Sequence, residues 1–253
     1  MIQTIDKSRV EQRFQKSISS YDANAVVQER ICEKLISLVE QRGVSSFDNV
    51  LEIGAGTGLL TRKLLERFSV RSLTLNDLVP AMSTPLQAIC NAYKTHVQFS
   101  MGDAEKIEFP VGYDLVISAS AIQWFTDFHS FMKKLKGILR PGGLVVLSTF
   151  APGNLDEIRT LTYNGLQYMS VDDLENCLSQ EFDVLSISEA ADEMYFEDPI
   201  QVLKHLKLTG VNGNSTERWT QSKVHTFSEE YSQCFKTDKG YRLTYRPVYV
   251  VLR

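Results

Sequence analysis

Cysteine is scarce in this 253-residue sequence, and its four cysteines lie far apart at Cys32, Cys90, Cys177 and Cys234. No two of them form a C-x-x-C pair, and no histidine stands beside one at metal-ligand spacing. The spacing therefore predicts neither a disulfide framework nor a zinc site. We expect free thiols and no bound metal.

Long apolar runs are also missing. No stretch reaches the roughly eighteen consecutive apolar residues from which a membrane-spanning helix is recognised. The N-terminus lacks the apolar segment of a signal peptide, because its first twenty residues include Asp6, Lys7, Arg9, Glu11, Arg13 and Lys16. We expect a cytoplasmic protein with no membrane partner.

Positive charge shows no overall excess, since the net charge is −4. General nucleic-acid binding needs a basic surface, so we expect no nucleic-acid partner. The charge is unevenly distributed: residues 151–199 carry one Lys or Arg against twelve Asp and Glu, whereas residues 200–253 carry nine against four. The basic C-terminal segment could attract an acidic partner.

Apolar spacing predicts a helical segment over residues 8–42, which ends at Gly43. Short apolar runs separated by helical stretches follow, and this alternation predicts a parallel, doubly wound sheet. The runs lie at 50–53, 72–75, 97–100, 114–118 and 144–150. Pro141-Gly142-Gly143 is expected to end a helix over 131–139 and to lead into the fifth strand.

The second half of the chain predicts further helices and two more strands. The helices are expected at 155–161, 171–178, 199–208 and 227–235, and the strands at 184–187 and 242–251. Pro247 is tolerated best near a sheet edge or a bulge. We expect one domain, made of a helical cap (1–45), a core (46–150) and a C-terminal part (151–253) with a lid inserted at about 197–240.

A glycine-rich turn follows the first predicted strand. Residues 50–58, VLEIGAGTG, place Gly54, Gly56 and Gly58 before a helix, where the backbone can approach a ligand closely. Leu59 stands where a dinucleotide-binding loop has its third glycine, which counts against a nicotinamide enzyme. The spacing instead resembles the S-adenosylmethionine (SAM) loop of class I methyltransferases. This resemblance implies a Rossmann-like, mostly parallel seven-stranded sheet with helices on both faces.

Residues at the ends of the following strands agree with that resemblance, because ligands bind at the carboxyl edge of such sheets. Asp77, next to Leu78, can accept both ribose hydroxyl protons, and Asp103 can accept an adenine amino proton beside the backbone of Ala104. Ser118 is expected near the methionine half of SAM, with Gln123 and Trp124 beside the transferred methyl group. Trp124 is equally suited to core packing. In the fold that it resembles, Glu52 also has a cofactor role.

The ends of the chain indicate a narrower family. Phe14, Tyr21, Asp22, Ala25 and Gln28 in RFQKSISSYDANAVVQ resemble the signature of the malonyl-acyl carrier protein O-methyltransferases, in which a helical cap closes over SAM. The segments HLKLTGVN (205–212) and RLTYRPVYVV (242–251) are similar to that family's lid and last strand. The resemblance implies methylation of the free carboxyl of a malonyl thioester on acyl carrier protein, a step of biotin synthesis. We expect a monomer.

Such a carboxyl group has a pKa of about 4 and is ionised at neutral pH, so its methylation needs no general base. The expected catalytic aid is a clamp on the carboxylate, for which the candidates are Tyr21, Lys207, Tyr245 and Arg246. His96, His129, His205 and His225 have no evident partner and are interpreted as surface or packing residues. Lys204, Lys207, Arg218, Lys223, Lys236 and Lys239 are candidates for docking the acidic carrier protein.

Two alternatives remain open at this point. The chain could methylate a free small acid such as aconitate, using the same core and cap. It could also be a regulatory module that binds SAM without catalysis. The retained glycines and the three acidic residues Glu52, Asp77 and Asp103 argue against the second alternative.

Overall fold

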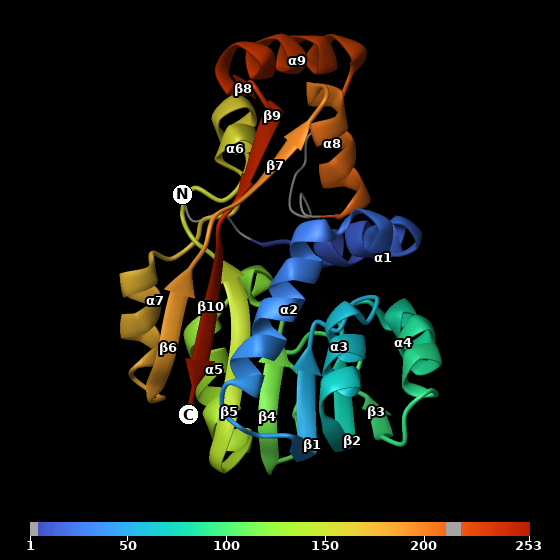
Figure 1. Cartoon of the computed structure of the whole chain (residues 1–253), viewed down its shortest axis with the longest axis vertical. Helices are drawn as coiled ribbons and strands as arrows, with labels where there is room; N and C mark the ends of the chain where they lie inside the picture. The colour runs from blue at the N-terminus through green and yellow to red at the C-terminus, as the bar shows by residue number, and fades with distance from the viewer. Residues whose placement is uncertain (1–4, 211–218) are drawn as a thin grey trace.

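Seven strands form a mostly parallel central sheet in the computed structural model, which describes residues 5–210 and 219–253 (Figure 1). Their order is β3-β2-β1-β4-β5-β10-β6, and β10 runs antiparallel to both of its neighbours. The strands are β1 (Ser46–Ile53), β2 (Ser69–Asn76), β3 (His96–Phe99), β4 (Tyr113–Ser118), β5 (Leu139–Phe150), β6 (Val184–Glu189) and β10 (Pro247–Leu252). The expected doubly wound α/β fold is confirmed.

Helices pack on both faces of this sheet, and successive side chains of each strand point alternately to the two faces. Val50 belongs to an apolar cluster with α2, α3 and α4, whereas its neighbour Leu51 belongs to a second cluster with α5 and α7. The helices are α1 (Lys7–Asn24), α2 (Val26–Glu40), α3 (Leu59–Arg67), α4 (Ser83–Cys90), α5 (Phe128–Ile138), α6 (Asp156–Thr162), α7 (Val171–Leu178), α8 (Pro199–Leu208) and α9 (Gln221–Phe235), with 3₁₀ turns η1 (Pro80–Met82) and η2 (Ile122–Trp124). Within the described ranges, no helix combines the length and apolarity that crossing a bilayer requires.

The N-terminal helical segment is divided in two, where the sequence predicted one continuous stretch. Ala25 leaves the helical region (φ −86°, ψ 42°), so that α1 and α2 meet at an angle. Figure 1 shows α2 against the sheet and α1 lying across the upper, carboxyl ends of the parallel strands. Residue propensity did not indicate this break, because alanine is the best helix former.

A small second sheet, β7-β9-β8, stands beyond the carboxyl edge with α6, α8 and α9 around it (Figure 1). Its strands are β7 (Asp192–Phe196), β8 (Lys236–Thr237) and β9 (Gly240–Tyr245). The single strand predicted over 242–251 was therefore wrong: it is divided at Arg246 between this sheet and the central one. Pro247 is the first residue of β10, a position that proline tolerates even in an interior strand.

The predicted helix over 131–139 ends one residue earlier, at Ile138, and β5 already begins at Leu139. Pro141-Gly142-Gly143 thus lies inside the start of the strand rather than before it. The register between β4 and β5 shifts at this point. A side chain at Gly143 would come within 2.8 Å of the Tyr113 carbonyl oxygen, so the glycine permits close approach of the two strands.

Candidate active site

The glycine loop after β1 forms one wall of a cavity at the carboxyl edge of the sheet. Gly54 and Gly56 line this cavity. Gly54 has a φ of 69°, and a Cβ atom there would lie 2.3 Å from the Cβ of Ala121 in the loop after β4. The two loops can approach this closely only because residue 54 lacks a side chain. Gly58 (φ 91°) is the N-cap residue of α3 and lies outside the cavity lining.

Asp77 follows β2 and holds the glycine loop in place. Its carboxylate accepts hydrogen bonds of 2.8 Å from the backbone N–H groups of Gly56 and Val79. Burial raises the pKa of Asp77 to about 6, although these two N–H groups lower it. Asp77 and Leu78 both line the cavity, as do Asp103 and Ala104 after β3.

Lys7, the first residue of α1, closes the other end of the cavity. Its ammonium group forms an ion pair of 2.5 Å with Asp103 and a second ion pair with Glu105. Burial raises the pKa of Glu105, but hydrogen bonds from Lys7 and from the backbone N–H groups of Thr126 and Asp127 outweigh this effect and lower it. The sequence interpretation missed Lys7, which lies 96 residues from Asp103 in the chain.

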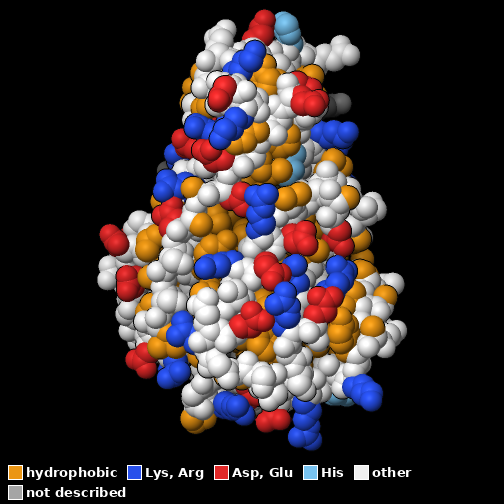
Figure 2. All heavy atoms as spheres, viewed as in Figure 1, with side chains coloured by type: hydrophobic (Ala, Val, Ile, Leu, Met, Phe, Trp, Pro, Cys, Tyr) orange, Lys and Arg blue, Asp and Glu red, His pale blue; other side chains and the backbone are white. Residues whose placement is uncertain are grey.

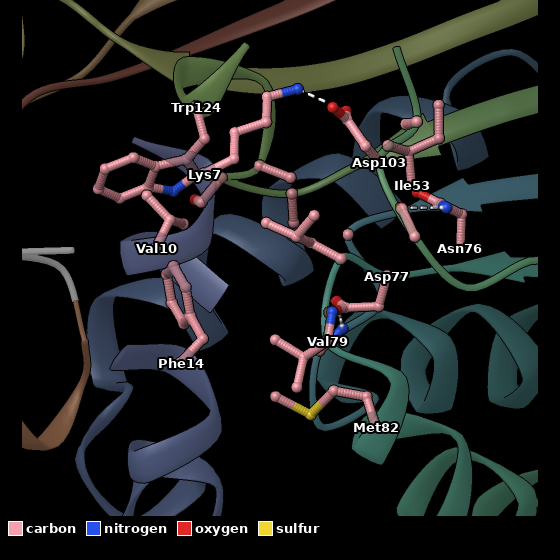
Figure 3. Close-up of a pocket in the computed structure, with 18 of the residues that line it drawn as sticks. Lys7, Val10, Phe14, Ile53, Asn76, Asp77, Val79, Met82, Asp103 and Trp124 are labelled. Atoms are coloured by element: carbon pink, nitrogen blue, oxygen red, sulfur yellow. Dashed lines mark hydrogen bonds and ion pairs between the residues drawn. The ribbon is translucent and has the colours of Figure 1, made fainter. Parts of the chain in front are cut away.

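Helix α1 covers the cavity with apolar and aromatic side chains. Figure 3 shows Val10 and Phe14 on one side, facing Asp77, Val79 and Met82 on the other. The ring of Phe14 packs edge-on against Trp124 of η2, with centroids 5.9 Å apart. The cap is also tied to the glycine loop, because the Thr57 hydroxyl donates to Asp22 of α1. About 790 Å³ of free space lies in this cavity and its solvent-filled mouth taken together.

Glu52 and Ser118, both predicted to contact the cofactor, lie behind the cavity wall and do not line it. Glu52 is buried and accepts a hydrogen bond from the Thr61 hydroxyl, and burial raises the pKa of its carboxyl group to about 8. The Ser118 hydroxyl donates to the Ile53 carbonyl oxygen at 2.9 Å and so joins the ends of β4 and β1. Both residues support the loops that form the wall.

A second, smaller pocket adjoins the first. Four residues line both cavities and therefore separate them: Phe14, Tyr21, Ser120 and Trp124. The remaining lining residues of the second pocket are Gln28, Gln123, Phe150, Asn154, Leu155, Leu166, Tyr168 and Tyr245. Of the predicted site residues, Gln123 and Tyr245 thus lie in the second pocket, as does Gln28, which was predicted to bind the cofactor but does not line the first cavity. Tyr21 and Trp124 lie at the boundary.

Tyr245, the last residue of β9, connects the second pocket to α8. Its hydroxyl lies 2.9 Å from Nε2 of His205 and accepts a hydrogen bond from the Gln28 side chain. Burial lowers the pKa of His205 to about 4, so the imidazole is neutral at pH 7. Its Nε2 can therefore accept a hydrogen bond from the Tyr245 hydroxyl. The sequence interpretation that His205 has no partner was wrong, because β9 and α8 are brought together only by the small sheet.

Two predicted clamp residues lie outside both pockets. Lys207 is exposed on α8. Arg246 forms an ion pair of 2.5 Å with Glu189 at the end of β6. The described residues contain no group of three or more His, Cys, Asp and Glu side chains that could hold a metal ion.

Comparison with known proteins relates this geometry to a family. A family model described as a methyltransferase domain matches residues 50–143. The YcgJ protein of Bacillus subtilis has a solved structure similar in fold, with a TM-score of 0.60 at 16% identity over 87% of this chain and 97% of that chain. This likeness concerns the fold alone.

Two curated relatives match over nearly their whole length. A malonyl-[acyl-carrier protein] O-methyltransferase of Chlorobium phaeovibrioides is 40% identical over 251 residues, which cover 98% of this chain and 96% of the relative. One from Porphyromonas gingivalis is 38% identical and covers 100% of this chain and 98% of the relative. The similarity extends through the cap and the small sheet as well as the glycine loop. The chain therefore belongs to the malonyl-[acyl-carrier protein] O-methyltransferase family.

Proposed function

We propose that this chain transfers the methyl group of SAM to the free carboxylate of a malonyl group carried on acyl carrier protein. The product is a methyl ester, which would serve biotin synthesis. The full-length similarity to proteins of that name supports the proposal. The observation that carries it in the structure is the second pocket, which adjoins the first through four shared residues.

The first cavity fits SAM. Gly54 and Gly56 let the backbone approach the ligand, and the Asp77 carboxylate keeps free lone pairs for the ribose hydroxyls after accepting two N–H groups. Asp103 and Ala104 would meet the adenine at the opposite end. When bound, SAM supplies a methyl group activated by a positively charged sulfur.

The second pocket fits the acceptor acid. The acid is ionised at neutral pH, so the residues around it have to bind, orient and desolvate it rather than remove a proton. Burial raises the pKa of Tyr21 well above its ordinary value, so its hydroxyl stays protonated and can donate a hydrogen bond at the boundary of the two cavities. We infer that Tyr21 orients the carboxylate toward the methyl group.

The carrier protein would dock on the small sheet and its helices. Lys204 and Lys207 on α8, Lys223 on α9, and Lys236 and Lys239 beside β9 are exposed, whereas Arg218 lies outside the described residues. Figure 2 shows basic side chains over this upper part of the molecule, interspersed with acidic ones. An acidic partner would be steered by the excess of basic residues in the segment 200–253.

Incubation of the chain with SAM and malonyl-carrier protein tests the proposal. Mass spectrometry should find the carrier heavier by one methylene group, and alkaline hydrolysis should remove the ester. Free trans-aconitate serves as the competing substrate. Methylation of aconitate but not of the carrier-bound malonyl group would replace the proposal with the small-acid alternative, and SAM binding without transfer to either would favour the regulatory module.

A further inference from the structure

Unpartnered polar atoms gather in the second pocket. Among the described residues, four buried side-chain atoms without a hydrogen-bond partner belong to residues that line it: Gln28 Oε1, Ser120 Oγ, Gln123 Oε1 and Trp124 Nε1. Buried polar atoms are normally paired, so such a cluster indicates a ligand. Ser120 Oγ can donate a hydrogen bond and Trp124 Nε1 can only donate. Gln123 Oε1 can only accept, because its amide nitrogen already donates to the Ser120 carbonyl oxygen.

Ser120 is held in an unusual conformation at the boundary of the two cavities. Its φ is 53°, in the left-handed region that serine seldom adopts. Two hydrogen bonds fix the backbone there: its N–H donates to the Ser148 hydroxyl at 3.0 Å, and its carbonyl oxygen accepts from Gln123 at 2.7 Å. Strained residues fixed in this way are concentrated at functional sites. The position of the Ser120 Cβ atom, from which the hydroxyl projects, is therefore closely determined.

The indole N–H of Trp124 is a buried donor at the boundary of the two cavities. The side chain is 7% exposed, and its ring packs edge-on against Phe14. Figure 3, which draws the lining of the first cavity, shows the indole nitrogen on the side of the ring that faces this cavity. Because Trp124 lines both cavities, a donor that is buried there without a partner can meet a ligand oxygen where the two cavities join.

Charge is missing from the described lining of the second pocket. Its twelve lining residues are aromatic, aliphatic, amide and hydroxyl side chains only. The tyrosines do not supply negative charge at pH 7, since burial raises the pKa of Tyr168 to about 12 and raises those of Tyr21 and Tyr245 further. Lys7 lines the other cavity and is engaged with Asp103 and Glu105.

We propose that Ser120 Oγ and Trp124 Nε1 bind the acceptor carboxylate as neutral donors, and that the sulfonium of SAM is its counter-charge, so that the acid binds tightly only after SAM. This inference rests on the proposed function and deepens it. A carboxylate moved from water into an uncharged pocket is costly unless a cation faces it. The same neutrality disfavours a free di- or tricarboxylate, whose further charges would find no partner among the described lining residues.

In the transfer itself, a carboxylate oxygen forms a bond to the methyl carbon while the carbon–sulfur bond breaks with its electron pair going to sulfur. No proton is exchanged. The negative charge of the carboxylate and the positive charge of the sulfonium both disappear, so the two products no longer attract each other. The neutral donors then hold an ester, which accepts weaker hydrogen bonds than a carboxylate, and product release is favoured.

Calorimetry on the full chain tests the counter-charge. A non-hydrolysable malonyl amide of pantetheine is titrated into enzyme saturated with S-adenosylhomocysteine, which is neutral at sulfur, or with sinefungin, which carries an ammonium group in place of the methylated sulfur. We expect at least about tenfold tighter acid binding with sinefungin. The methyl ester of the same amide is the control and should not distinguish the two complexes. Equal affinity of the acid for both complexes would overturn the proposal.

Two variants test the donors. Ser120→Gly removes the hydroxyl and suits the positive φ, and Trp124→Phe removes the N–H but keeps an aromatic ring beside Phe14. Each should weaken acid binding to the sinefungin complex by about tenfold, a larger loss than any loss of sinefungin affinity, because both residues also line the first cavity. Ser179→Ala at the C-cap of α7 and Trp219→Phe, beside Phe227, are the matched controls.

Retained acid affinity in both variants would remove these donors from the site, and an equal loss of sinefungin affinity would reduce them to packing residues. Failure of the proposed function has a different signature, because it would appear as no methyl ester on the carrier-bound malonyl group. Ester formation together with equal acid affinities would reject the counter-charge alone.

Discussion

Lys7 at the start of α1 forms an ion pair of 2.5 Å with Asp103 in the loop after β3, although the two residues are 96 positions apart. Both side chains are more than four-fifths buried. Removing one partner of a buried ion pair leaves the other charge uncompensated. The pair therefore fixes the N-terminal end of the cap over the first cavity.

Substitution of Lys7 by Met should free this end of α1. Because Glu105 would lose its cation and Asp103 would keep only the more distant Lys106, at 3.8 Å, we expect faster hydrogen exchange across α1 and faster release of SAM, with a stability loss of about 1–3 kcal/mol. Hydrogen-exchange mass spectrometry measures the first effect, and stopped-flow displacement the second. Lys16→Met, at an exposed position on the same helix, is the control. Unchanged exchange in α1 would show that the ion pairs do not hold the cap.

Asp77→Ala should weaken SAM binding by roughly 1.5–3 kcal/mol or more, because charge-assisted hydrogen bonds to the ribose hydroxyls would be lost. Calorimetric titration gives the affinity, and circular dichroism establishes that the variant is folded. A folded variant with the affinity of the parent chain would exclude Asp77 from the cofactor site.

The raised pKa of Asp77 makes the same contact sensitive to pH. Hydroxyl donors favour the charged carboxylate, so SAM affinity should be full well above pH 6 and should fall as the pH drops through about 6. Asp77→Asn carries no titrating group there and should lack this dependence while binding more weakly at pH 7. If the parent chain and the Asn variant gave parallel pH curves, some other group would be responsible.

Tyr21→Phe should lower turnover more than it lowers SAM affinity, since the hydroxyl is expected to act on the acid at the boundary of the two cavities. Single-turnover rates and equilibrium binding on the same preparation separate the two quantities. The ring packing against Phe14 is preserved in this variant. Losses of equal size in both quantities would indicate a packing role only.

Added salt should lower the second-order rate constant for the carrier-bound substrate and have little effect on that for a small malonyl thioester. Salt screens the attraction between charged protein surfaces once the screening length falls to about 10 Å. Charge reversal at Lys204 and Lys223 together should lower the second-order rate constant for the carrier substrate. Charge reversal at Lys94 and Lys133, which are exposed beside the central sheet and away from the basic segment 200–253, is the control. Identical salt curves for the two substrates would contradict docking on the basic segment.

The sequence predicted the elements that depend on neighbouring residues. The alternation of strands and helices, the glycine loop and the positions of Asp77 and Asp103 after their strands are local patterns, and the sequence alone predicts each of them. The break at Ala25 was not, because packing of α1 across the sheet edge overrides its helix propensity.

Contacts between distant segments were the features that sequence alone could not supply. Lys7 reaches Asp103 and Tyr245 reaches His205 only after the cap and the small sheet are in place. Ser120 was missed for another reason: its left-handed backbone and unpartnered hydroxyl are properties of conformation, which no residue pattern near it encodes. Ser118, two residues earlier, has the right residue type but points into the sheet.

The non-helical Ala25 gives α1 the geometry of a lever. Its eighteen residues span about 27 Å at 1.5 Å per residue, from Ala25 at one end to Lys7 at the other. A rotation of about 20° at Ala25 would displace Lys7 by roughly 9 Å, whereas Tyr21, close to the pivot, would move by only about 2 Å. Such a rotation would open the cavity at Lys7, beside the place proposed above for adenine, by the width of a ring system, while the wall at Tyr21 would stay almost closed and α2 would stay packed in the core.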